Sequence, residues 1–195
     1  IKMLSRAEKP LFLAGGGVNI AKANENFTKL VEKTNVPVVT TIMGRGAIPT
    51  NHPLFIGNLG MHGAYAANMA VSECDLLFSI GTRFNDRITG KLHAFAPNAQ
   101  IVHIDIDTGS ISRNVHVDIP IVADALEATE KMLEYVEEMD TKEWLSQIGE
   151  WKEEYPLTMN RENKLTPQSI IQTINETFEE VIVVTDVGQH QMFTT

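Results

Sequence analysis

The chain has 195 residues, a hydrophobic content of 43% and a formal net charge of −9 at pH 7. This length suits one full domain, or one domain with a piece of another, and the apolar share is sufficient for a buried core. The acidic balance, without any cluster of Lys or Arg, disfavours a nucleic-acid partner. No apolar stretch approaches the roughly 20 residues that a membrane-spanning helix needs, so we expect no membrane partner either.

The single cysteine, Cys74, excludes a disulfide framework and suits a reducing compartment, so we expect a cytoplasmic protein. Cys74 lies in a helical stretch, residues 64–74, among alanines and methionines. That setting favours a buried, unreactive thiol over a catalytic nucleophile. The chain begins without Met, inside a stretch that reads as a helix, which predicts a fragment of a longer protein.

Residues 1–140 alternate between apolar, strand-like runs and helical patterns. A helix after the first strand is indicated by Ile20, Ala23, Phe27, Leu30 and Val31, which are spaced by three and four. Strands are predicted at residues 11–14, 37–41, 75–80, 100–106 and 119–122. This alternation predicts an α/β fold, a Rossmann-like doubly wound parallel sheet with right-handed crossovers.

The helix that follows the last of these strands has a clear start and an apolar face. Asp124 can cap it, with Glu127 three residues further on. Leu126, Thr129 and Val136 lie on its predicted inner face, together with Leu133. Residues 1–140 are therefore expected to form one nucleotide-binding domain.

Residues 141–165 differ in character from this domain. They contain an amphipathic helix with Trp144 and Ile148 on its apolar face, followed by a stretch of linker composition. Thr166-Pro167 then has the signature of a helix start, and residues 181–185 form a β-branched run typical of a buried strand. Residues 166–195 are thus expected to be the truncated start of a second α/β unit.

Ligands of open parallel sheets bind at the carboxyl ends of the strands. The residues at these predicted ends are small, basic or acidic. Small residues let a ligand approach backbone N–H groups, arginines match phosphates, and carboxylates accept from ribose hydroxyls. The set predicts a site for a nucleotide cofactor with a pyrophosphate: Gly15-Gly16-Gly17, Thr40-Thr41, Gly44, Gly46, Gly81, Arg83, Arg87, Asp105 and Asp107.

The residues alone leave the identity of the nucleotide open. The dinucleotide fingerprint G-x-G-x-x-G is only partly met, because Ile20 holds its last position, and threonines stand where NAD binding favours a carboxylate. Taken singly, the Gly triplet could be a plain turn, the arginine pair a solvated surface pair, and His62 a capping residue. The scattered histidines do not indicate a metal site.

Five stretches of the sequence carry a resemblance to a known family: "TTIMGRGAIP", "NLGMHGAYAANMAV", "IGTRFNDRITGKLHAFAP", "IVHIDIDTGSISRNV" and "VVTDVGQHQM". In this order they are similar to the catalytic large subunits of the acetohydroxyacid synthase (acetolactate synthase) family, which are thiamine-diphosphate enzymes. The resemblance covers essentially the whole chain. It implies the central, FAD-binding domain of that family, followed by the start of its C-terminal, thiamine-diphosphate-binding domain.

The resemblance also implies an activity and its partners. Family members condense two pyruvates to 2-acetolactate and CO2, or pyruvate with 2-ketobutyrate, in branched-chain amino-acid synthesis. Thiamine diphosphate with Mg2+ carries this chemistry, and FAD takes no net redox part in it. The 2-ketoacids are the small-molecule substrates, the large subunits form a homodimer, and a small regulatory subunit is possible.

Cofactor contacts carry over by position. Gly188, Gln189 and His190 match the loop that touches thiamine diphosphate, and Asn85 departs from the family's usual aspartate. The implied FAD contacts are Gly16, Gly17, Thr41, Ile42, Met43, Leu59, Gly60, Met61, His62, Gly63, Gly81, Thr82, Arg83, Asn85, Arg87, Ile88, Asp105, Ile106 and Asp124.

The family's activating glutamate and its Mg2+-binding motif have no counterpart in these residues. We therefore assign no catalytic residue and no metal ligand, and expect the piece to be inactive alone. Two alternatives remain: a related pyruvate oxidase or other thiamine-diphosphate carboligase, or a stand-alone nucleotide-binding module.

Overall fold

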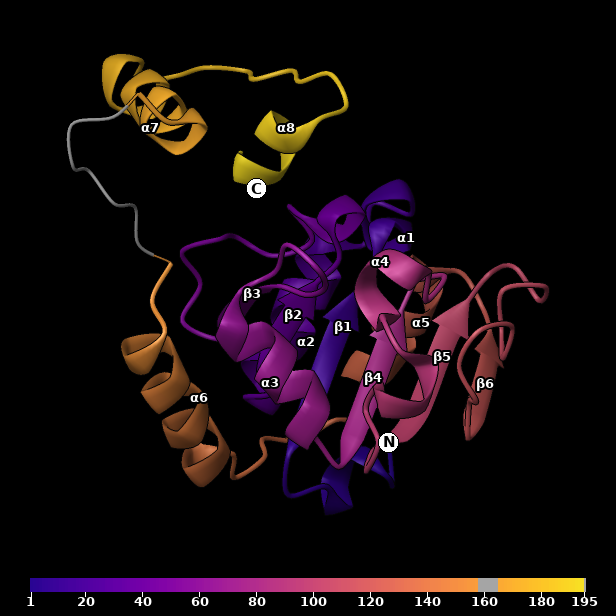
Figure 1. The fold of residues 1–195 in the computed structure, drawn as a ribbon. Coiled ribbons are helices and arrows are strands. Elements are labelled where there is room, and N and C mark those ends of the chain that lie inside the picture. Colours follow the sequence, from indigo (N-terminus) through magenta and orange to yellow (C-terminus); the bar gives the residue numbers. More distant parts are fainter. Residues whose placement is uncertain (158–164, 195) are drawn as a thin grey trace. The chain divides into compact units, whose positions relative to one another are not determined.

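The computed structural model describes residues 1–157 and 165–194 (Figure 1). The chain divides into two compact units, Ile1–Tyr155 and Pro156–Thr195. Most of the predicted linker, residues 158–164, lies outside the described residues. Within the described ranges, no helix has both the length and the apolar character needed to cross a membrane.

The first unit is built on a parallel, six-stranded sheet in the order β3-β2-β1-β4-β5-β6. The order reverses between β1 and β4, as in doubly wound folds, so the predicted fold class is confirmed. The strands are β1 (Pro10–Ala14), β2 (Val38–Thr40), β3 (Phe55–Asn58), β4 (Leu76–Ile80), β5 (Gln100–Asp105) and β6 (Ile119–Val122).

The edge strand β3 has no counterpart in the sequence prediction, which treated this stretch as a loop. Pro53 precedes it, and Gly57 within it has a φ of 148°. Its register against β2 also shifts between Val38 and Val39. Such breaker residues conceal a short, irregular strand, because they are typical of loops and bulges.

The helices of the first unit follow the predicted alternation with two corrections. The N-terminal stretch that reads as a helix contains only the 3-10 turn Leu4–Arg6. The helix predicted from Ile20 to Val31 is two helices, because Lys22 adopts a left-handed conformation with φ of 57°. Ile20 is consequently 85% exposed and not part of an inner face. The helices are α1 (Gly16–Ile20), α2 (Asn24–Thr34), α3 (Tyr65–Glu73), α4 (Asp86–Thr89), α5 (Ala125–Leu133) and α6 (Lys142–Glu154), with 3-10 turns at Leu4–Arg6, Ile42–Gly44 and Leu92–Ala94.

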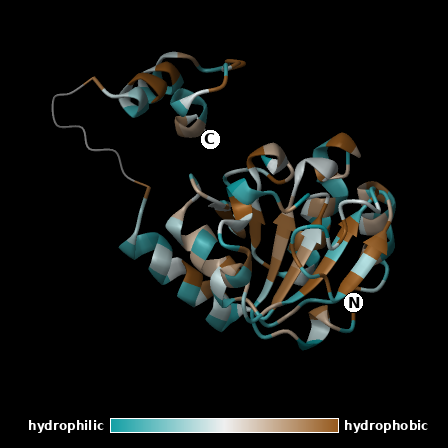
Figure 2. Cartoon of the chain, turned by 45° about the vertical axis from the view of Figure 1, so that its right-hand side comes forward, coloured by the Kyte–Doolittle hydropathy of each residue, from teal (hydrophilic) through white to brown (hydrophobic). Residues whose placement is uncertain are grey.

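The core lies in two layers, one on each face of the sheet. Alternate residues of each strand point to opposite faces, so Phe12 packs with α2 and α5, whereas Leu11 and Leu13 pack with α3 and α6. The central strands are apolar along their length, while the helices alternate between apolar and polar residues (Figure 2). This is the pattern of a parallel sheet covered on both sides.

Helix α6 packs against α3 within the first unit. The indole of Trp144 is 2% exposed, and its Nε1–H donates to the carbonyl oxygen of Pro10 over 3.0 Å. The hydroxyl of Thr141 donates to the carbonyl oxygen of Asn35 over 2.7 Å. Ile148 is buried as well, so the predicted apolar face of this helix is confirmed.

The second unit contains the helices α7 (Pro167–Thr177) and α8 (Gln189–Phe193). The predicted start of α7 is confirmed by a capping box between Thr166 and Ser169. The strand predicted at residues 181–185 is not formed, and Ile182 and Val184 are 93% and 89% exposed. A strand needs a neighbour for its backbone groups, and the described part of this unit supplies none.

Two glycine substitutions test the packing of the first unit. A Cβ added at Gly44 would lie 2.1 Å from the carbonyl oxygen of Ala14, whereas one at Gly149, inside α6, would meet nothing within 4 Å. Gly44→Ala should lower the free energy of unfolding by about 1–3 kcal/mol, the usual cost of overpacking. Gly149→Ala should raise it by about 1 kcal/mol, because Ala is the better helix former. Urea unfolding followed by tryptophan fluorescence measures both, and a stable Gly44→Ala variant would contradict the packing described.

Candidate functional site

A cleft of about 510 Å³ lies at the carboxyl ends of the central strands, where the strand order reverses. This is the position at which doubly wound sheets bind ligands. Most of the predicted FAD contacts line it, which brings together residues from the ends of five strands. They are Gly16, Gly17, Thr41, Ile42, Met43, Gly81, Thr82, Arg83, Asn85, Arg87, Ile88, Asp105, Ile106 and Asp124.

The remaining predicted residues lie elsewhere. Residues 59–63 form the loop between β3 and α3, which packs beside the cleft without lining it. The N–H of Met61 donates to the carbonyl oxygen of Arg87 over 3.1 Å, and a Cβ on Gly60 would lie 2.4 Å from that same oxygen. Gly188, Gln189 and His190 belong to the second unit, at the start of α8.

The floor of the cleft is backbone, because the ends of β1 and β4 touch directly. The N–H of Gly17 donates to the carbonyl oxygen of Gly81 over 3.0 Å, and a Cβ on Gly81 would lie 2.6 Å from the Cα of Gly17. Gly81 has a φ of 64°, which L side chains rarely adopt. Glycine at these positions is therefore required by the contact between the two strand ends.

The loop after β2 is held by asparagine side chains. The Nδ2 group of Asn19, on α1, donates to the carbonyl oxygens of Met43 and Arg45 over 3.0 Å and 2.8 Å. Asn24 donates in turn to the Oδ1 of Asn19 over 2.7 Å and to the carbonyl oxygen of Gly46 over 2.7 Å. These contacts fix the wall of the cleft that Met43 forms. Neither asparagine carries a sequence signal that predicts this role.

The cleft places positive and negative side chains on neighbouring strand ends. Arg83 and Arg87 are exposed, on the loop and helix after β4. Asp105 ends β5 with only 9% exposure, and its Oδ1 accepts from the N–H of Asp107 over 2.8 Å. Such a set can bind an anion on one side and hydroxyl groups on the other.

Two further aspartates line the cleft in structural roles. Hydrogen bonds from the hydroxyl of Ser110 and the N–H of Gly109 lower the pKa of the Asp107 carboxyl. Asp124 accepts from the N–H of Leu126 over 2.8 Å, which confirms the predicted cap of α5. The carboxylates of both residues thus already accept hydrogen bonds from backbone N–H groups around the cleft.

The cleft also has lining residues that the assigned contacts did not include. Ile20 is the clearest, because the left-handed turn at Lys22 leaves it at the rim, where Met43 and Ile106 are also 71% and 70% exposed. Exposed apolar side chains around a polar floor suit a ligand with flat apolar rings. Asp107 already belongs to the strand-end set predicted from the sequence, and the other added residues are Ile20, Ala21, Ile104, Ser110, Ala123 and Ala125.

Other candidate residues lie away from this chemistry. Cys74 is fully buried, as predicted, and burial raises the pKa of its thiol to about 12, which disfavours the reactive thiolate. His62 is exposed on the β3–α3 loop. Among the residues that the structure describes, no three His, Cys, Asp or Glu side chains are grouped so that they could hold a metal ion.

Three relatives match nearly the whole chain. The acetolactate synthase large subunit of Buchnera aphidicola (subspecies Schizaphis graminum) is 46% identical over 200 residues, which cover 100% of this chain. The probable acetolactate synthase large subunit of Methanococcus aeolicus is 43% identical over 99% of the chain, and the acetolactate synthase isozyme 3 large subunit of Escherichia coli is 41% identical over 99%. The chain spans 35% of the length of each of these relatives.

A family model provides the broader assignment. The model described as "Thiamine pyrophosphate enzyme, central domain" matches residues 1–132. These residues comprise the whole six-stranded sheet and nearly all of α5, including every residue that lines the cleft. The chain therefore belongs to the thiamine pyrophosphate enzyme family, and residues 1–132 correspond to that family's central domain.

Proposed function

We propose that the chain is the FAD-binding central segment of an acetolactate synthase large subunit. The complete protein would condense two pyruvates to 2-acetolactate with release of CO2, or pyruvate with 2-ketobutyrate. Support comes from relatives of that name, 41–46% identical along almost all of the chain. Because the chain spans 35% of those relatives, this activity is proposed for the complete protein.

One observation carries the FAD proposal: a glycine floor, two arginines and a buried carboxylate meet in a single cleft. The backbone at Gly17 and Gly81 leaves room for a close approach, and Arg83 and Arg87 supply charge for a pyrophosphate. Asp105 offers a carboxylate oxygen to ribose hydroxyls. The exposed apolar rim suits the adenine and isoalloxazine rings, so the residues present fit the group.

The two cofactors would have different roles in the complete protein and would contact different parts of this chain. Thiamine diphosphate, when bound, supplies the carbanion stabilisation that the condensation needs. This chain would bind and orient FAD in its first unit, and Gly188, Gln189 and His190 would contact the thiamine cofactor. We assign no catalytic residue and no Mg2+ ligand to these residues.

The proposed organisation follows the resemblance. Residues 1–140 would form the FAD-binding domain, residues 141–165 a helix and linker, and residues 166–195 the start of the C-terminal domain. We further propose a cytoplasmic enzyme that forms a homodimer of large subunits and that a small regulatory subunit can bind. A pyruvate oxidase, another carboligase of the family, or a stand-alone nucleotide-binding module are the alternatives.

A titration with FAD tests the cofactor directly. We expect the purified chain to quench the fluorescence of added FAD and to shift its visible absorption, because the apolar rim would shield the isoalloxazine ring. Riboflavin, which lacks the pyrophosphate, should bind at least tenfold more weakly, since one lost charged contact is worth roughly 1.5–3 kcal/mol. Affinity for NAD(H) or ADP without affinity for FAD would refute the proposal.

Charge-removing substitutions test the role of the arginines. Arg83→Gln and Arg87→Gln should each weaken FAD binding by about tenfold or more, because each removes a charged hydrogen-bond donor. Arg6→Gln, the same change in the Leu4–Arg6 turn outside the cleft-lining set, is the matched control and should leave the affinity unchanged. Calorimetric titration gives the FAD affinity of all three variants. Equal affinities would show that the two arginines do not contact FAD.

A further inference from the structure

We propose that His103, buried behind the cleft, is a positioning residue that fixes the loop between β4 and α4 and thereby the place of Arg83. The inference rests on the proposed FAD site, because Arg83 is one of its assigned contacts. His103 lies in β5, has no exposed surface, and lines no part of the cleft. It can therefore act on a ligand only through its neighbours.

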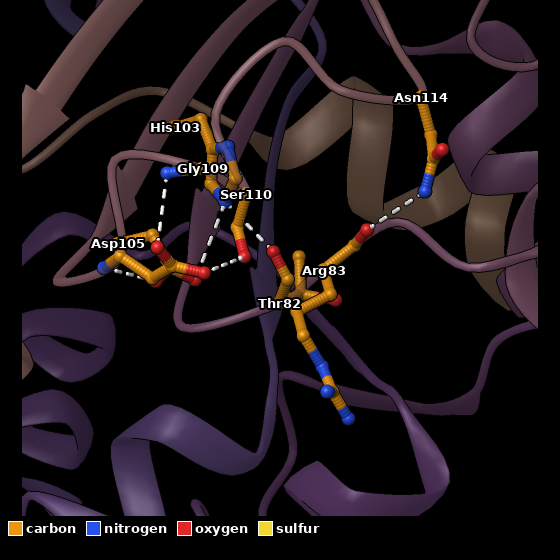
Figure 3. A network of polar contacts seen from close by, with 8 residues as sticks. Thr82, Arg83, His103, Asp105, Gly109, Ser110 and Asn114 are labelled. Atoms are coloured by element: carbon orange, nitrogen blue, oxygen red, sulfur yellow. Dashed lines mark hydrogen bonds and ion pairs between the residues drawn. The ribbon is translucent and has the colours of Figure 1, made fainter.

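The first contact defines the state of the imidazole. The Nε2 atom of His103 lies 2.7 Å from the carbonyl oxygen of Thr82, which is the first loop residue after Gly81 (Figure 3). A carbonyl oxygen only accepts, so the proton of the neutral ring must be on Nε2. The Asp105 carboxylate lies 3.7 Å from the same nitrogen, beyond hydrogen-bond distance, and its charge favours an N–H pointing this way.

The second contact explains how the loop keeps a strained conformation. Phe84 has a φ of 47°, which is unusual for a bulky side chain. Its buried ring packs edge-on against the imidazole, with centroids 4.9 Å apart, and against Phe95 at 5.8 Å. A backbone conformation of this kind persists only where its surroundings determine it.

A third contact holds the loop from the other side. The Nδ2 group of Asn114 donates to the carbonyl oxygen of Phe84 over 3.0 Å, and lies 3.3 Å from that of Arg83. Thr82 and Phe84 are 4% and 2% exposed, whereas Arg83 between them is exposed. Figure 3 shows its side chain extending away from both His103 and Asn114. Anchoring both neighbours thus directs Arg83 into the cleft.

His103 is also an unfavourable residue for simple packing. Burial lowers the pKa of its imidazole, against the opposing effects of the Thr82 carbonyl and Asp105. Its Nδ1 atom is buried without a partner among the described residues, as is the hydroxyl of Ser79, its cross-strand neighbour. An apolar side chain would avoid this cost, so the polar ring is better explained by its bond to Thr82.

Matched substitutions separate positioning from packing. A glutamine amide can place its N–H near the position of Nε2, whereas the shorter asparagine amide reaches only toward Nδ1. We expect His103→Gln to keep FAD affinity within about threefold of the parent, and His103→Asn to lose about tenfold, the usual value of one hydrogen bond. Ser79→Ala, which removes a buried hydroxyl without a partner, should leave the affinity unchanged. Equal affinities for the Gln and Asn variants, or an equal loss in Ser79→Ala, would overturn the proposal.

A spectroscopic measurement on the unaltered chain tests, without FAD, which nitrogen of His103 carries the proton. Two-bond 1H–15N correlation spectra distinguish the two neutral imidazole tautomers, and we expect His103 to carry its proton on Nε2. A proton on Nδ1 would overturn the proposal even if every variant folds and binds. Failure of the parent chain to bind FAD would contradict the proposed cofactor, while the tautomer would still decide whether His103 holds Thr82.

Discussion

The first unit depends on the direct backbone contact between the ends of β1 and β4. At this point Gly17 and Gly81 approach so closely that neither tolerates a side chain without displacing the other. Because these strands are where the sheet order reverses, their helices depart to opposite faces and leave the cleft between them. Because neither glycine has a side chain at this contact, the floor of the cleft consists of peptide groups. The same contact therefore lets a ligand approach the backbone closely at this point of the open sheet, while the N–H groups of Gly17 and Gly81 themselves donate to the carbonyl oxygens of Gly81 and Ile104.

The walls of the cleft are held by neutral hydrogen bonds to carbonyl oxygens. Asn19 fixes the loop after β2, and Asn114 and His103 fix the loop after β4. None of these groups carries a charge, so these walls are held without ion pairs to Arg83 or Arg87, although the charge of Arg83 contributes to the lowered pKa of the Asp107 carboxyl. Both arginines thus stay available to an anionic ligand, in a cleft that Asp105, Asp107 and Asp124 also line. Its shape should also depend little on salt concentration, since neutral bonds are not screened.

The sequence predicted the sheet well where apolar runs were uninterrupted, as in β1, β4 and β5. It failed where a single residue changed the local backbone: Gly57 concealed β3, and Lys22 divided the first predicted helix. The strand-end residues could be assigned to one site because parallel strands present their carboxyl ends at one edge. The hydrogen bonds that hold the cleft walls could not be predicted from the sequence. His103 and Thr82 are separated by 21 residues along the chain, and Asn19 and Met43 by 24 residues. Such contacts follow from tertiary packing and leave no periodic signal.

The unpaired run at residues 181–185 has a consequence for handling the protein. Its side chains are β-branched, it contains no proline or charge, and Ile182 and Val184 are almost fully exposed. Segments of this composition pair readily with copies of themselves and seed cross-β aggregates. Glu179, Glu180 and Asp186 flank the run with negative charges that oppose such stacking. Loss of these flanking negative charges should therefore lower the colloidal stability of this chain.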